Sequence, residues 1–254
     1  MIDSEYNLSM KPKAVILICA DAEWNAIIQL VPGAKVSAAP YGDYFFALLN
    51  NRIPIDISQE GETGDKNAIP VVFLHTGWGK IGAAGATQFA IDQWQPHLLV
   101  NLGTCGGFEG SIQAGEILLV DRTVVYDILE QMGDYDAHIA HYTCVLDYGW
   151  LSEPYPQAVL RTLLVSGDRD LVVEDLPQLK QRYGAVAGDW ESGAIAFVAQ
   201  RNSVRLLILR GVTDLVGPGG GEAYGNPEIF RQATRGIMQR LLEFLPQWVE
   251  QGIG

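Results

Sequence analysis

Residues 206–217, LLILRGVTDLVG, join an apolar run to a polar tip, and the rest of the chain is interpreted around them. The run LLIL predicts a buried strand, and Arg210, Thr213 and Asp214 follow it closely. In open α/β sheets, ligands bind beyond the carboxyl ends of the strands. This placement makes Asp214 a candidate site residue, and the alternative is an aspartate that caps a helix or a turn.

Three further strand ends carry polar or glycine-rich tips. Glu23 follows the apolar run of residues 14–19, Glu191 lies in DWES at the start of a helical pattern, and the turn GTCGG follows the strand-like PHLLVNLG. Because parallel strands end at one edge of a sheet, the four tips predict one shared site. The alternation of strands with helical patterns, closed by an amphipathic helix over GNPEIFRQATRGIMQRLLEFLPQWV, predicts an α/β protein.

The composition predicts one acidic globular domain. The chain has 254 residues, of which 48% are hydrophobic and 19% charged, so we expect a polar tail over residues 1–12 and a domain over 13–254. A net charge of −13 argues against nucleic acid and anionic membranes as partners and favours a small-molecule ligand. The apolar runs are too short to span a bilayer. Three cysteines without paired spacing indicate a reducing compartment, so we expect a cytoplasmic protein.

Two segments are candidates for moving or contacting parts. Residues 133–156 lack a regular pattern and are rich in tyrosine, which favours a lid or a subunit contact; a packed surface loop is the alternative. GPGGGEAYG follows Asp214 closely and is either a gating lid or a linker. The polar stretch SQEGETGDKN predicts an exposed loop.

Other chemistries have weaker support in the sequence. Gly77-x-Gly79-x-x-Gly82 has the strand–turn–helix context of a dinucleotide fingerprint, but the next strand ends in Asn101 instead of the acidic residue that would hold a ribose. The histidines and cysteines lack metal-ligand spacing, so we predict neither a metal nor another cofactor. Cys105 is either a nucleophile or, more simply, a small buried thiol.

Three carboxylates remain, Glu23, Glu191 and Asp214. Such a set suits cleavage of a glycosidic bond. One acid protonates the leaving group, another carboxylate activates water, and further polar groups stabilise the oxocarbenium-like sugar.

The ordered motifs VILICADAEW, TGWGKIGAAGA, LLVNLGTCGGF, AGEILLVD, LLVSGD, DWESGAIAFVA and LRGVTD resemble those of the nucleoside phosphorylase/nucleosidase superfamily. Within it the chain is most similar to the 5′-methylthioadenosine/S-adenosylhomocysteine nucleosidases, over about residues 13–245. The resemblance implies a single α/β domain with a mixed, partly barrel-like central sheet flanked by helices. It also implies a homodimer that hydrolyses a purine nucleoside to free base and sugar, as in methionine salvage.

The resemblance implies roles for single residues. Asp214 matches the aspartate that protonates the purine at N7, and Glu191 matches the glutamate that holds the ribose hydroxyls. Glu23 matches the glutamate that orders the attacking water, although a one-residue shift of the alignment places Trp24 there. The other positions expected to bind substrate are Thr104, Gly106, Trp190 and Arg210, and Trp190 stands where the family usually has methionine.

Water, and not phosphate, is the predicted nucleophile. Phosphorylases of the superfamily resemble one another in a GDPxR-like first turn and in an arginine three residues before the serine of the glycine turn. Here the first turn is CADAEW, and Asn101 lies three residues before Thr104. A carboxylate repels a phosphate dianion but can hold water. A phosphorylase, a futalosine-type hydrolase and a non-catalytic nucleoside-binding protein stay open as alternatives.

Overall fold

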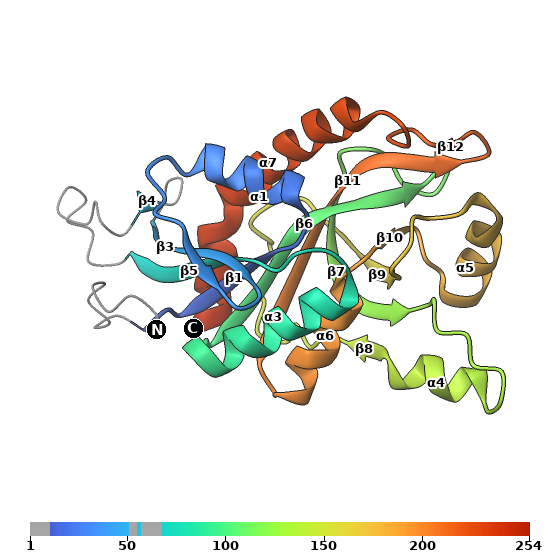
Figure 1. Ribbon diagram of the computed structural model, residues 1–254, viewed down its shortest axis with the longest axis horizontal. Coiled ribbons are helices and arrows are strands. Elements are labelled where there is room, and N and C mark those ends of the chain that lie inside the picture. Colours follow the sequence, from blue (N-terminus) through green and yellow to red (C-terminus); the bar gives the residue numbers. More distant parts are fainter. Residues whose placement is uncertain (1–10, 51–54, 57–67) are drawn as a thin grey trace.

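The computed structural model describes residues 11–50, 55–56 and 68–254, and its strands form one mixed sheet (Figure 1). The strands are β1 (Ala14–Ile18), β2 (Ser37–Ala39), β3 (Gly42–Leu49), β4 (Ile55–Asp56), β5 (Ile69–His75), β6 (Leu98–Phe108), β7 (Ile117–Val125), β8 (Thr143–Val145), β9 (Leu160–Ser166), β10 (Ala187–Asp189), β11 (Arg205–Gly217) and β12 (Gly220–Gly221). The helices are α1 (Asp21–Leu30), α3 (Gly79–Trp94), α4 (Tyr135–His141), α5 (Leu176–Tyr183), α6 (Ser192–Arg201) and α7 (Pro227–Ile253), with a 3₁₀ turn η2 (Val173–Asp175).

Five of the strands close into a ring. The sheet order runs β12-β11-β7-β9-β10-β6-β1-β5-β3-β2, and β11 also pairs with β6 in parallel over almost its whole length. Strands β11, β7, β9, β10 and β6 therefore form a closed barrel, while β1, β5, β3 and β2 extend from β6 as an open sheet. The predicted mixed, partly barrel-like sheet is confirmed.

Strand β1 lies in the middle of the open part and pairs in parallel with β5 and β6. All five of its residues are buried, as its continuous apolar run AVILI predicts for a strand covered on both faces. Because β1 ends beside Asn101 of β6, the residues that follow β1 are delivered to the next part of β6, which carries GTCGG.

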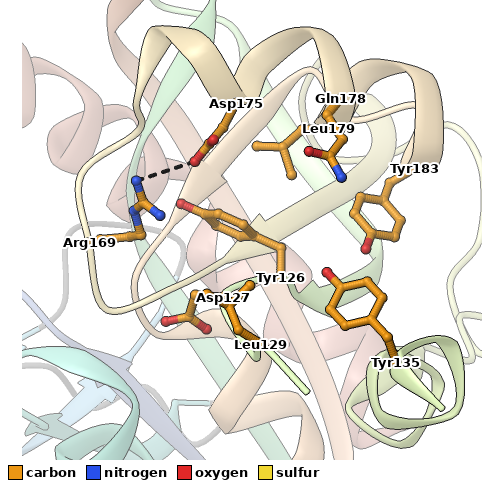
Figure 2. Close-up of a pocket in the computed structure, with 9 residues that line it drawn as sticks. All are labelled: Tyr126, Asp127, Leu129, Tyr135, Arg169, Asp175, Gln178, Leu179 and Tyr183. Atoms are coloured by element: carbon orange, nitrogen blue, oxygen red, sulfur yellow. Dashed lines mark ion pairs between the residues drawn. The ribbon is translucent and has the colours of Figure 1, made fainter. Parts of the chain in front are cut away.

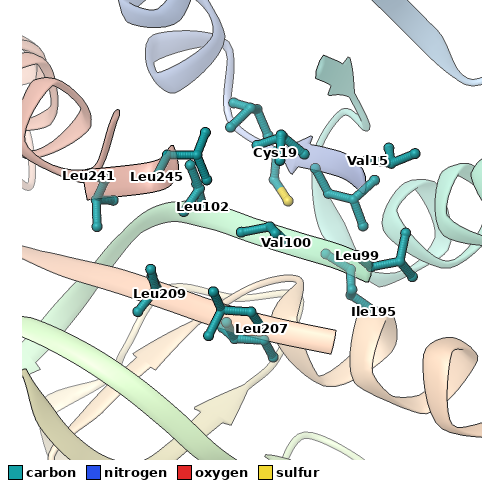
Figure 3. Packing of buried hydrophobic residues seen from close by; sticks show 14 of the residues in the cluster. Val15, Cys19, Leu99, Val100, Leu102, Ile195, Leu207, Leu209, Leu241 and Leu245 are labelled. Carbon is teal, nitrogen blue, oxygen red and sulfur yellow. The ribbon is translucent and has the colours of Figure 1, made fainter. Parts of the chain in front are cut away.

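Helices cover the two faces of the sheet. In Figure 1, α1 and α7 lie on one side and α3 and α6 on the other. Figure 3 shows the core between them, where Leu99 of β6 and Leu207 of β11 meet Ile195 of α6, and Leu241 and Leu245 of α7 pack from the other side. All five side chains are fully buried, so the barrel wall is closely packed on both faces.

The structure corrects the prediction that residues 133–156 are irregular. They contain α4 and β8, and the Asp134 side chain caps α4 by accepting hydrogen bonds from the N–H groups of Asp136 and Ala137. Tyr148 is buried and donates its hydroxyl to the carbonyl of Val120 at 2.7 Å. The helix was missed because seven residues are too few for a visible period.

Two other predicted segments have different outcomes. GPGGGEAYG contains β12, which turns back on β11 and pairs Gly221 with Val216. The predicted tail lies almost wholly, and the loop SQEGETGDKN wholly, outside the described residues, so both stay predictions. Within the described part of the chain, no helix is long and apolar enough to cross a membrane.

Candidate active site

Arg210 is the buried centre of the site. It lies on β11 with 1% of its area exposed, and its Nη2 lies 2.8 Å from Oδ2 of Asp189. Its Nη2 also donates to Oδ1 of Asn101 at 2.7 Å, and its Nε donates to Oγ of Ser192 at 3.0 Å. A Cβ on Gly103 would lie 1.9 Å from Nη1, so this glycine makes room for the guanidinium. Full pairing is required because an unpaired buried charge is strongly destabilising.

Asp189 fixes the other side of this arginine. Its carboxylate accepts hydrogen bonds from the hydroxyl of Ser166 at 2.6 Å and from the hydroxyl and N–H of Ser192 at 2.5 and 3.1 Å. Ser192 begins α6, where the helix dipole favours a carboxylate. The sequence analysis did not identify Asp189, Ser166 or Ser192 as site residues. The only sequence feature that could have identified them is their position: Ser166 ends a strand, and Asp189 and Ser192 lie at the start of a helix.

Glu23 lies against the same arginine from the end of β1. It is 2% exposed, and its Oε1 accepts hydrogen bonds from the N–H and hydroxyl of Thr104 at 2.6 and 2.8 Å. Its Oε2 accepts from the N–H groups of Cys19 and Ala20 at 3.3 and 3.1 Å. Nη1 of Arg210 lies 3.7 Å from Oε1. The predicted trio of Glu23, Thr104 and Arg210 is thus in direct contact.

The alternative alignment, with Trp24 in this place, is not what the structure shows. The Trp24 ring stacks on His75, with ring centroids 5.3 Å apart and planes 6° from parallel. It belongs to the apolar packing of α1, whereas Glu23 turns toward β6.

Glu191 lies at the N-terminus of α6 and is 8% exposed. Its Oε1 accepts a hydrogen bond from the N–H of Gly79 at 3.0 Å. Burial, and then the charge of Asp189, raises the pKa of the Glu191 carboxyl to about 8. Gly79 has a φ of +75°, so the turn at the start of α3 needs a glycine there. The amide that a dinucleotide fingerprint would offer to phosphate is occupied by this carboxyl.

Asp214 lies in β11 next to an irregularity in the strand. The pairing of β11 with β6 shifts register between Val212 and Asp214, which leaves Thr213 as a bulge. Asp214 is 6% exposed, and Thr213 donates its hydroxyl to Oδ1 at 2.7 Å. Burial raises the pKa of the Asp214 carboxyl above its ordinary value. A carboxyl that keeps its proton more readily is suited to act as a general acid.

Two cysteines are buried beside site elements: Asn101 donates to Sγ of Cys19 at 3.6 Å, and Sγ of Cys105 donates to the carbonyl of Gly211 at 3.7 Å. Apart from burial, the charges of Glu191 and Glu23 raise the pKa of the Cys19 thiol, and those of Asp214 and Glu23 raise that of Cys105. Glu23 bonds to Thr104, and Asp214 pairs with Gly106 two residues further along β6, so these two carboxyl groups lie along the same strand. Because burial holds both thiols in the protonated form, the structure gives no support to Cys105 as a nucleophile.

The remaining predicted positions have weaker evidence. Gly106 pairs with Asp214 across β6 and β11, so it lies beside the candidate acid. Trp190 is half-buried between Asp189 and Glu191, and its role in binding stays a prediction. Among the described residues, no group of three His, Cys, Asp or Glu side chains could hold a metal ion.

The chain is similar in sequence to known proteins. The model of the phosphorylase superfamily matches residues 57–245. The 5′-methylthioadenosine/S-adenosylhomocysteine nucleosidase of Haemophilus influenzae is 30% identical over 162 residues, which are 59% of this chain and 71% of that protein. The nucleosidase of the same name from Buchnera aphidicola is 26% identical over 155 residues, or 57% of this chain and 67% of that protein.

Solved structures show the same fold. The nucleosidase of that name from Helicobacter pylori, solved with a pyrrolidine ligand, has a TM-score of 0.72 and 16% identity, covering 94% of this chain and 98% of its own. The one from Colwellia psychrerythraea, solved with adenine, has a TM-score of 0.69 and 19% identity, covering 95% and 96%.

Proposed function

This chain belongs to the phosphorylase superfamily, and on that premise we propose that it hydrolyses the N-glycosidic bond of a purine nucleoside to free base and sugar. One observation carries the proposal: Glu23 is hydrogen-bonded to Thr104 of β6, and the buried acid Asp214, whose pKa is raised, pairs with Gly106 two residues further along the same strand. Nucleoside hydrolysis needs both, one to hold water and one to protonate the base.

Asp214 is the proposed general acid. The purine must leave as a neutral base, so a proton has to reach its N7 as the bond to the sugar breaks. Burial keeps a proton on Asp214, and Thr213 orients the carboxyl through Oδ1. The backbone N–H of Ala223 also donates a hydrogen bond to this carboxyl and helps to orient it.

Glu23 is the proposed partner of the attacking water. Three backbone N–H groups, of Cys19, Ala20 and Thr104, donate hydrogen bonds to Glu23, and the Thr104 hydroxyl donates a fourth. A carboxylate has about four acceptor sites, so a water can bind Glu23 once this hydroxyl turns toward it. Thr104 then holds the water from one side and Glu23 from the other.

Glu191 is the proposed contact to the ribose hydroxyls. With a pKa of about 8, its carboxyl both donates and accepts hydrogen bonds near neutral pH. Gly79 fixes one oxygen, which leaves the other for the sugar.

Phosphorolysis is the second candidate, and the state of Arg210 weighs against it. Proteins bind phosphate dianions mainly through arginines that make bidentate contacts. The Arg210 guanidinium already contacts Asp189, Asn101 and Ser192, with Glu23 beside it. It has no free edge to offer a phosphate.

The test is base release in phosphate-free buffer. The chain is incubated with 5′-methylthioadenosine, S-adenosylhomocysteine and adenosine, and free base and sugar are separated by chromatography. We expect adenine and free sugar, with little change on adding phosphate. Formation of a sugar 1-phosphate would favour a phosphorylase, and binding without base release would favour a non-catalytic protein. An Asp214→Asn preparation controls for contaminating activity.

We also propose that the chain acts as a homodimer. The aromatic residues of 133–156 are less available for a contact than the sequence predicted, since Tyr148 is buried. Trp78 and Ile81 at the start of α3 are instead 65% and 88% exposed. Sedimentation should give a dimer at micromolar concentration, which Ile81→Glu weakens and Ile229→Glu, at a 46% exposed position of α7, leaves intact. A monomer for the unchanged protein would contradict this.

The cytoplasm is the proposed compartment. Its support is that Cys19, Cys105 and Cys144 are buried, unpaired thiols, which suit a reducing environment. Mass spectrometry of thiol-labelled protein from intact cells should find all three reduced.

A further inference from the structure

A second pocket lies where the end of β7 faces α4 and α5, and it shares no lining residue with the site above. Its volume is about 240 Å³, smaller than the roughly 300–1,000 Å³ of pockets for drug-sized ligands. It is lined by Tyr126, Asp127, Leu129, Tyr135, Arg169, Asp175, Gln178, Leu179 and Tyr183 (Figure 2). Three aromatic rings and two leucines make it a place for a small flat molecule.

Tyr126 brings an unused hydrogen-bond donor to this pocket. Its side chain is only 7% exposed, and its hydroxyl has no hydrogen-bond partner within the described residues. Burial raises the pKa of Tyr126 to about 12, so the hydroxyl keeps its proton. In Figure 2 the hydroxyl points toward the Arg169–Asp175 end of the pocket. A buried polar group without a partner is costly, so a ligand acceptor placed there would be favoured.

The charged residues of the lining select against an ionic ligand. Arg169 lies 3.3 Å from Asp175, and Asp127 is paired with Lys80. Each charge in the lining therefore already faces an opposite charge. An added ion would have to break one of these pairs, whereas a neutral ring would not.

We propose that this pocket binds a neutral, planar heteroaromatic molecule of one or two rings, with a ring nitrogen or carbonyl oxygen that accepts the hydrogen bond of Tyr126. Ring contacts with Tyr135 and Tyr183 supply the apolar part of the binding. The proposal does not depend on the function of the carboxylate site.

The first experiment measures how many adenine molecules bind per chain, by equilibrium dialysis of labelled adenine and by soaking crystals. We expect density for adenine in the pocket. Tyr126→Phe removes only the hydroxyl and should weaken binding there about five- to tenfold. Tyr148→Phe is the matched control, because it removes a buried hydroxyl outside the pocket and should leave adenine binding unchanged.

A second probe isolates the hydrogen bond. Naphthalene has a similar planar shape but neither a hydrogen-bond donor nor an acceptor, so Tyr126→Phe should not weaken its binding. Absence of adenine from the pocket at millimolar concentration would overturn the proposal. Equal adenine affinity of Tyr126→Phe and the unchanged protein would overturn it too, as would an equal weakening of adenine and naphthalene binding in that variant.

The two sites can fail separately. Base release by Tyr126→Phe should stay within about twofold of the unchanged protein, because Tyr126 is not in the catalytic machinery. If the proposed nucleosidase activity is wrong, dialysis should still find the class of adenine sites that Tyr126→Phe weakens.

Discussion

The two ends of the carboxylate site are held in different ways. At one end Glu23 and Arg210 are 2% and 1% exposed and are bonded to groups from β6, β10 and α6. At the other end Asp214 is held by its neighbour Thr213, and the glycine-rich hairpin of β11 and β12 follows. Both ends belong to the closed barrel, but side chains from several elements hold the first, and the second lies just before the hairpin of β11 and β12. Water needs a fixed position, whereas a large base needs a way in.

The largest effect on this comparison is expected from removing the Arg210 cation, which lies beside Glu23. Arg210→Met leaves Asp189 and Glu23 buried without their shared counter-charge. We expect a loss of about 3–5 kcal/mol in the free energy of unfolding, as for other broken buried ion pairs. Urea unfolding measures it.

Arg205→Met is the matched control on the same strand, since Arg205 is exposed, donates to the carbonyl of Gly252 and lies over the Trp150 ring, with no buried carboxylate as its partner among the described residues. We expect at most about 1 kcal/mol there. An equal loss of unfolding free energy in the two variants would mean that the Arg210 charge does not stabilise the Glu23 end of the site.

The second prediction changes the candidate acid Asp214 and should leave the fold intact. Asp214→Asn keeps the shape of the side chain but removes the transferable proton. Turnover should fall by roughly 10²–10⁴-fold, the usual contribution of general acid catalysis, while nucleoside binding and the urea midpoint change little. Steady-state and binding measurements decide it, with Asp92→Asn on α3 as a control. Near-normal turnover would exclude Asp214 as the acid.

Much of the site could be predicted because its main residues follow apolar strands. Glu23, Thr104, Arg210 and Asp214 each stand at or near the end of such a run, and the structure brings the first three into contact. The partners of Arg210 could not be predicted in the same way. Asn101 and Ser192 reach it only because β11 pairs with β6 and closes the barrel, a contact between residues more than 100 positions apart in the case of β6.

The same argument explains why the position of Tyr148 could not be predicted. The tyrosines of 133–156 favoured an exposed contact, but Tyr148 bridges two strands by donating to Val120 and accepting from the N–H of Ile208. Local composition cannot distinguish an aromatic ring at an interface from one that seals a barrel. The neighbouring strands decide, and they are distant in sequence.

The third prediction concerns pH and Glu191, which lies between the two ends. Its folded pKa of about 8 is above the ordinary value of 4.5, so the folded state binds this proton more tightly than the unfolded state does. The resulting stabilisation is complete below pH 4.5 and is lost as pH rises toward 8. Its size is on the order of a few kcal/mol.

Glu191→Gln removes the titration, so the fall in unfolding free energy between pH 5 and 8 should be shallower in this variant. Urea unfolding at a series of pH values tests it, with Glu116→Gln, a carboxylate exposed on the surface, as the control. Parallel curves for Glu191→Gln and the unchanged protein would show that Glu191 does not carry the raised pKa.

The smallest expected effect comes from glycine substitutions in the hairpin of β11 and β12, which follows Asp214. Gly219 and Gly220 are neighbours in the hairpin, and a Cβ on either would meet nothing within 4 Å. They differ in backbone, because Gly220 has a φ of +93° and Gly219 lies outside the left-handed region. Gly220→Ala should therefore cost about 1–2 kcal/mol of local strain, whereas Gly219→Ala should be neutral or stabilise by up to about 1 kcal/mol.

Because the strain falls on the hairpin and not on the barrel, Gly220→Ala should speed hydrogen exchange at the N–H of Leu215, which donates to Glu222. Exchange at Thr104, bonded to Glu23, should not change. We expect a several-fold change in KM with kcat within about threefold, since a 1–2 kcal/mol strain corresponds to about a 5- to 30-fold shift of the local opening equilibrium. If exchange at Thr104 and Leu215 rises together, the two ends open as one unit and the contrast between them fails.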